Sequence, residues 1–317
     1  MSVLLWIALA LAFPAAKQSS FDADKGSAKW TLHWTFVDET GKSRKVAADL
    51  SASAIERDNS TPRQFPASEA AKAEVKAIEH YADAPGGPKI KAKATKSGGV
   101  SIQVSGKSSS RMHAAMDGAK AAAKDALDGW LSRHGYTRLK NDAIVPDHAR
   151  LADEYADDVG PLADALSAGT TDERTFVARA LRFVQAIPYE AKKSGGDAGF
   201  RRPLSLLARN KGDCDSKATL FLALVRARYP ELDSTVVIIP NHAFAGVAIE
   251  PMAGERSFAL GSERYVALEP VGPAAAPPGK VSGSAGWHLF WGSNEKRPLP
   301  EGTGGTSLGG QSGLSPN

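Results

Sequence analysis

The stretch that decides the fold is Gly212-Asp213-Cys214-Asp215-Ser216-Lys217-Ala218. An apolar run follows it as far as Tyr229, with large side chains at Phe221, Leu222, Leu224 and Val225. This pattern predicts a buried helix that begins near Cys214. The backbone N–H groups at the start of a helix, and the positive end of its dipole, stabilise a thiolate.

Cys214 is the only cysteine in the 317 residues, so it forms no disulfide within the chain. A lone cysteine is an inert buried residue, a link to another chain or a reactive thiol. The predicted position at a helix start favours the reactive thiol, because the thiolate is the nucleophilic form.

A thiol nucleophile needs a base and a group that orients the base, and two later strands supply candidates. His242 opens the predicted strand 242–247, and Glu269 ends the predicted strand 265–268. If these strands are antiparallel neighbours, the two side chains lie side by side. Glu250 and Glu263 are competing acids, but Glu250 is too far along the strand from His242 and Glu263 precedes its strand.

These three pieces carry a resemblance to a known family. Gly-Asp-Cys-Asp-x-Lys-Ala at 212–218, with Pro203-Leu204 before it, resembles the nucleophile motif of the transglutaminase-like superfamily. The segment 241–244 (Asn-His-Ala-Phe) resembles its histidine strand, and 268–270 (Leu-Glu-Pro) resembles its acid strand. The similarity covers about residues 173–270, and Glu269 stands where the family usually has Asp.

The resemblance implies a papain-like α+β core with Cys214 as nucleophile, His242 as base and Glu269 as orienting acid. The implied activity is that of a thiol hydrolase, which cleaves peptide or glutamine amides of a protein or peptide substrate through a cysteinyl thioester. If an amine opens the thioester, the protein is a crosslinking transglutaminase. A catalytically retired binding module is the further alternative. No metal or organic cofactor is expected, since clustered metal ligands and a phosphate-binding glycine motif are lacking.

The rest of the chain is divided by composition. Residues 28–140 predict a small N-terminal α+β domain of two hairpins and two helices, because strand and helix periodicities follow each other in that order. Residues 141–170 are acidic and predict a linker. Residues 171–295 form the predicted transglutaminase-like domain, and 296–317 the predicted disordered tail.

The N-terminus predicts export. Residues 1–16 contain an apolar run from Val3 to Phe13 that is too short to span a bilayer and is followed by small residues. This favours a signal peptide and a secreted or periplasmic protein, with an uncleaved N-terminal membrane anchor as the alternative. No integral membrane domain is expected further along the chain.

Charge is unevenly distributed. The net charge of +4 is too small to indicate a nucleic-acid partner. Residues 87–140 nevertheless carry 11 Lys and Arg against 3 Asp and Glu, whereas residues 141–173 carry 1 Arg against 9 acids. The two segments either neutralise each other and face solvent, or the basic N-terminal domain binds an anionic polymer or lipid headgroups of the cell envelope.

Overall fold

The computed structural model describes residues 13–83, 87–191, 199–240, 242–281 and 295–299. The chain is α+β, as predicted, and it divides into two compact units. The larger unit comprises residues 1–59, 148–196 and 201–317, and the smaller unit comprises residues 60–147 and 197–200. Among the described residues, no helix combines the length and the apolar character needed to cross a membrane.

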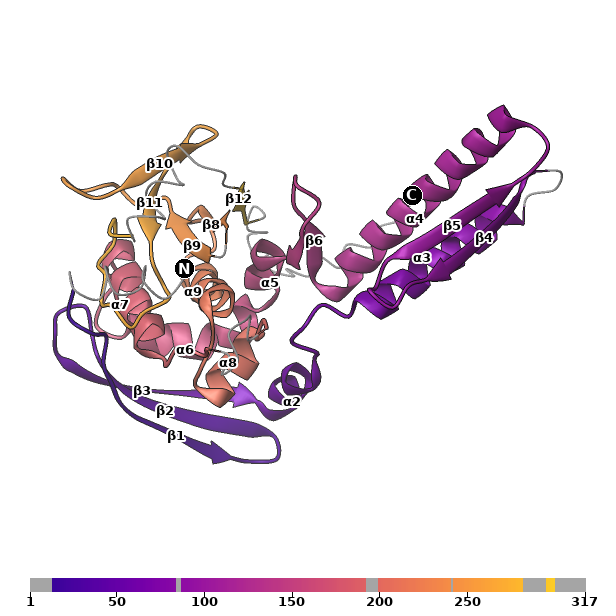
Figure 1. The fold of residues 1–317 in the computed structure, drawn as a ribbon. Coiled ribbons are helices and arrows are strands. Elements are labelled where there is room, and N and C mark those ends of the chain that lie inside the picture. The colour runs from indigo at the N-terminus through magenta and orange to yellow at the C-terminus, as the bar shows by residue number, and fades with distance from the viewer. Residues whose placement is uncertain (1–12, 84–86, 192–198, 241, 282–294, 300–317) are drawn as a thin grey trace, which may run out of the picture. The chain divides into compact units, whose positions relative to one another are not determined.

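The larger unit is built on a five-stranded antiparallel sheet with the order β10-β11-β9-β8-β12. Helix α9 packs against β8 and β9 of this sheet, and helices α5 to α8 pack against α9 (Figure 1). The elements of this sheet and its helices are α5 (His148–Glu154), α6 (Ala156–Ser167), α7 (Glu173–Ala186), α8 (Pro203–Arg209), α9 (Cys214–Arg228), β8 (Ser234–Ile239), β9 (His242–Val247), β10 (Ser257–Leu260), β11 (Glu263–Leu268) and β12 (Glu295–Pro298).

Helix α9 is the centre of the larger unit. It is buried from Ser216 to Arg226, which is why its sequence is apolar on every face rather than on one stripe. Five of its large apolar side chains are fully buried: Leu220, Phe221, Leu222, Leu224 and Val225. The helix and the residues at its start are therefore held on a rigid, closely packed element.

The first sheet of the chain also belongs to the larger unit. It has the order β1-β2-β3 and is formed by β1 (Gln18–Lys25), β2 (Lys29–Val37) and β3 (Ser43–Ser51), followed by α2 (Ala52–Ser60). The predicted N-terminal domain 28–140 is therefore wrong at its start. Trp34 and Phe36 lie edge-on against Phe183 of α7, with ring centroids 5.4 Å apart in both pairs. The alternation of apolar and polar residues in β2 is typical of a half-buried strand, but it carries no information on which helix covers that strand.

The segment 141–170 is not a linker, which corrects the second predicted boundary. Helices α5 and α6 bury Leu151, Val159, Leu162 and Leu166 completely or almost completely. Both helices pack against α9. The acidic side chains that suggested a linker occupy the outer faces of these helices, while an apolar stripe faces the core.

The two ends of the chain lie largely outside the described residues. The predicted signal peptide 1–16 is described only from Phe13, and Ala15 forms a bridge with Ala274. The predicted disordered tail 296–317 is described only to Leu299. Its first residues are ordered, since β12 pairs antiparallel with β8 through Pro298. This pairing uses backbone groups at the edge of the sheet, so the polar side chains of β12 gave no sign of it.

The described residues of the smaller unit form two helices and two hairpins. Its elements are α3 (Ala67–Ala82), β4 (Lys89–Ala94), β5 (Val100–Ser105), α4 (Ser109–His134), β6 (Tyr136–Arg138) and β7 (Ile144–Pro146). One face of the β4-β5 hairpin packs on the helices, through Ile90, Ala92, Val100 and Ile102 against Ile78, Ala119 and Ala123 (Figure 1). Helix α4 begins at the Ser108 cap and ends at Gly135, whose positive φ of 75° suits glycine.

Candidate active site

Cys214 is the first residue of α9, as the sequence predicted. Asp213 caps the helix, since its side chain accepts hydrogen bonds from the N–H and the hydroxyl of Ser216 at 3.1 and 2.5 Å. A side chain at Gly212 would collide with Leu206, whose Cδ1 lies 2.6 Å from where a Cβ would be. The glycine therefore allows the chain to enter the helix in close contact with α8.

His242 and Glu269 meet as predicted. His242 is the first residue of β9, and Glu269 directly follows β11, the antiparallel neighbour of β9. The Nε2 atom of His242 lies 2.9 Å from Oε2 of Glu269. The Glu269 side chain is 1% exposed and that of His242 is 13% exposed, so the pair is shielded from water. Shielding strengthens the interaction between the carboxylate and the imidazole.

The competing acids lie elsewhere. Glu263 is exposed and opens β11, at the opposite end of the strand from Glu269. Glu250 follows β9, and its backbone carbonyl accepts a hydrogen bond from Arg174 of α7. The structure therefore brings one of the three acids considered, Glu269, to His242.

The thiol lies beside the start of β9. The backbone N–H of Ala243, the residue after His242, is close enough to the Cys214 sulfur to lower its pKa. The sulfur also donates a hydrogen bond to Oδ1 of Asp215 at 3.2 Å. The Asp215 carboxylate in turn contributes to the electrostatic environment of the His242 ring. Asp215 is thus a common neighbour of the thiol and the imidazole.

The electrostatics at the thiol differ from the expectation. The helix start predicted a lowered thiol pKa, but burial raises the pKa of Cys214 well above its ordinary value. The negative charges of Asp215 and Asp213 raise it further, and the N–H of Ala243 lowers it by a smaller amount. Burial lowers the pKa of His242, but the Glu269 carboxylate outweighs this effect and the net pKa is raised. In this state the thiol is a hydrogen-bond donor, and the raised pKa of His242 makes its imidazole a stronger base.

Replacing Asp215 by Asn is expected to speed alkylation of Cys214. In the wild-type protein the Asp215 carboxylate lies 3.2 Å from the sulfur, and its negative charge raises the thiol pKa. The substitution removes this charge, so the thiol pKa should fall. A fall of one pKa unit gives about ten times more thiolate at any pH below the pKa. We therefore expect the iodoacetamide rate at pH 7 to rise about tenfold. Asp172→Asn, which removes a capping acid at α7, is the control, and an Asp215→Asn rate equal to it would contradict this account.

Three buried or half-buried polar residues around the site were not predicted. Asp215 and Lys217 follow Cys214 in the first turn of α9, and Gln185 lies near the end of α7. The Nε2 atom of Gln185 donates hydrogen bonds to the carbonyls of Glu269 and Ala276 at 2.9 and 2.8 Å. The signal in the sequence was a polar residue within an apolar stretch, which ordinarily indicates the solvent face of a helix.

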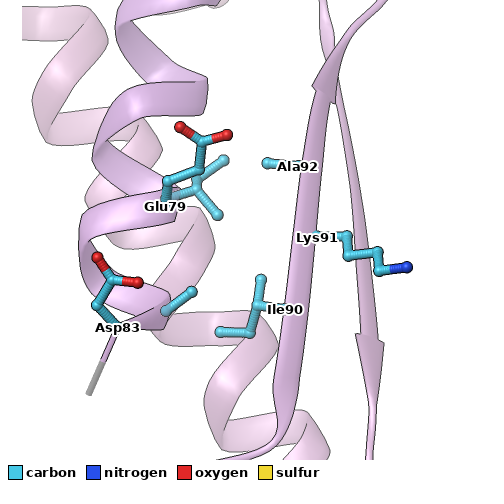
Figure 2. A pocket seen from close by; sticks show the side chains of 7 residues that line it. Glu79, Asp83, Ile90, Lys91 and Ala92 are labelled. Carbon is cyan, nitrogen blue, oxygen red and sulfur yellow. The ribbon is translucent and has the colours of Figure 1, made fainter.

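Two other features of the described residues do not compete with this site. The described residues contain no group of three His, Cys, Asp or Glu side chains arranged to hold a metal ion. A hollow in the smaller unit lies between α3 and β4 (Figure 2), and it contains none of the candidate residues. Its lining residues are Ile78, Glu79, Ala82, Asp83, Ile90, Lys91 and Ala92.

Comparisons with known proteins identify no relative. No family model matches the chain, and no curated protein or solved structure matches it.

Proposed function

We propose that the chain is a thiol hydrolase related to the transglutaminase-like superfamily, acting on peptide or glutamine amides. The observation that carries this proposal is the 2.9 Å contact between His242 Nε2 and Glu269 Oε2, beside a helix that begins with Cys214. A thiol at a helix start, an imidazole and a buried acid are the groups that nucleophilic acyl transfer requires.

The proposed reaction has two stages. The thiol proton passes to Nδ1 of His242, because Nε2 is engaged with Glu269, and the Cys214 sulfur attacks the amide carbonyl. Backbone N–H groups at the start of α9 stabilise the oxyanion. The C–N bond then breaks, His242 returns the proton to the departing amine, and a thioester remains on Cys214. Water opens the thioester and releases the acid.

The raised pKa values fit a proton that moves only when the substrate binds. Asp215 holds the thiol as a donor in the resting site. A substrate that enters the site excludes water and places its carbonyl carbon next to the sulfur. Proton transfer to His242 and attack on this carbon therefore occur together. Glu269 stabilises the imidazolium that this transfer produces.

One assay tests the reaction and distinguishes hydrolysis from crosslinking. The protein is incubated with a glutamine-containing protein and a labelled primary amine. Hydrolysis predicts cleavage products or free glutamate without incorporated label, whereas crosslinking predicts labelled protein. If neither product forms across a range of protein substrates, the retired binding module is favoured.

We also propose that the protein is exported, on the basis of residues 1–16, and that the smaller unit binds an anionic polymer of the cell envelope. In β4 the lysines Lys89, Lys91 and Lys93 are exposed, and their partners on β5 are uncharged. Figure 2 shows the Lys91 side chain turned away from α3. Changing these three lysines to Gln is expected to abolish binding to poly(glycerol phosphate), and wild-type binding should weaken steeply with salt. Binding that is indifferent to salt would contradict this part of the proposal.

A further inference from the structure

Lys217 is a fully buried lysine in the first turn of α9, close to the candidate nucleophile. Lysines are rarely buried, because an ammonium loses its hydration inside the protein unless other groups replace it. Here Nζ donates hydrogen bonds to the backbone carbonyls of Ile187 at 2.5 Å and Val271 at 2.6 Å. Two neutral acceptors do not compensate a buried positive charge.

The two carbonyls connect Lys217 with the rest of the site. Ile187 is the C-cap of α7, and Val271 lies two residues beyond Glu269. The Lys217 ammonium therefore links the segment that follows Glu269 to helix α9, which begins with Cys214. Gln185 holds the same chain from α7 through the carbonyl of Glu269.

Glu269 can supply the negative charge that compensates the positive charge of Lys217. The Glu269 side chain is fully buried, its Oε2 faces His242, and its Oε1 has no hydrogen-bond partner among the described residues. No direct ion pair joins Lys217 and Glu269, but the two charges interact through the protein. Burial lowers the pKa of Lys217 to about 7, while the Glu269 carboxylate acts in the opposite direction.

We propose that Lys217 is a positioning residue of the site, whose buried ammonium supplies the counter-charge of Glu269 and fixes the acid segment to the nucleophile helix. It acts on His242 through Glu269 and touches no substrate. The inference rests on the proposed function only in treating Cys214, His242 and Glu269 as one catalytic unit.

A double-mutant cycle tests this inference without a substrate. The variants are Lys217→Met, Glu269→Gln and the pair, and the readouts are Tm and the rate at which iodoacetamide alkylates Cys214 at pH 7. Lys217→Met leaves the carboxylate without its cation, so Glu269 takes up a proton and no longer supports the imidazolium. We expect a tenfold slower alkylation and a Tm lower by several degrees. In the Glu269→Gln background the same change should alter the rate less than twofold.

The double variant decides between a charge role and a structural one. Its Tm is expected to exceed that of Lys217→Met, because the amide introduced by Glu269→Gln avoids the cost of protonating or burying an unpaired carboxylate. Equal losses from Lys217→Met in both backgrounds, or no loss in either, would overturn the inference. If Lys217→Met does not fold, the double variant should still fold; its failure while Glu269→Gln folds would also overturn it. Lys211→Met, at an exposed lysine near the same helix, should change neither readout.

The outcome is independent of the proposed reaction. Coupling between Lys217 and Glu269 in a protein that cleaves no amide would retain this inference and reject the proposed function. An additive cycle, in a protein whose amide cleavage depends on Cys214, would do the reverse.

Discussion

Cys214→Ala is expected to lower kcat for amide cleavage by at least about 10⁴-fold, because the sulfur forms the covalent bond on which both stages depend. The sulfur lies at the first residue of a helix that is packed on all sides, so the alanine variant should fold normally. The measurement is turnover in the glutamine and amine assay, with Tm recorded for each protein.

Cys214→Ser is the matched control for this variant. It retains a side chain of similar size at the helix start but replaces the thiol with a much weaker nucleophile, so its turnover should also be very low. Because the chain contains one cysteine, no second thiol can take over the reaction. A Cys214→Ala protein that retains wild-type turnover would remove the sulfur from the mechanism and leave the binding-module alternative.

Glu269→Gln is expected to lower kcat by about 10⁴-fold, the size of loss found when the orienting acid of a triad is made neutral. The amide has almost the same volume as the carboxylate, so the buried position stays filled. It cannot stabilise a positive charge on His242, and the pKa of His242 should fall because the carboxylate is what raises it. The measurement is the pH dependence of kcat/KM together with the titration of the imidazole.

Glu263→Gln is the control at the other end of β11. Glu263 is exposed and lies far from His242 along the strand, so this change should alter kcat less than twofold. A similar loss of kcat in both variants would show that neutralising either acid of this sheet lowers kcat, with no special role for Glu269. Retention of wild-type kcat in Glu269→Gln would exclude Glu269 as the acid that orients His242 in the proposed triad.

The geometry of the site could be predicted where the signals are local. A glycine and an acid before an apolar run predicted the helix that begins at Cys214, and the order of two strands predicted the contact between His242 and Glu269. The roles of Gln185 and Lys217 depend on carbonyls that come from distant segments, and no local pattern encodes those contacts. The predicted lowering of the thiol pKa was wrong, because the effect of the helix start was considered without the burial of Cys214 or the adjacent charge of Asp215.

The individual strands and helices could be predicted, but the division of the chain into two units could not. The alternation in β2 predicted a strand, yet the covering residue, Phe183, lies in a helix far along the chain. The acidic residues of 141–170 concealed the buried stripe that includes Leu162. Both errors have the same physical origin, because burial is a property of the assembled chain and periodicity describes a single segment.

The rate at which iodoacetamide alkylates Cys214 at pH 8, compared between the wild-type protein and His242→Gln, tests the central claim most directly. If the imidazole takes the thiol proton as the sulfur attacks, it assists alkylation at a pH well below the raised pKa of the thiol. The account then predicts alkylation at least about tenfold slower in His242→Gln. Equal rates in the two proteins would show that the thiol and the imidazole do not act together, and would contradict the proposed active site.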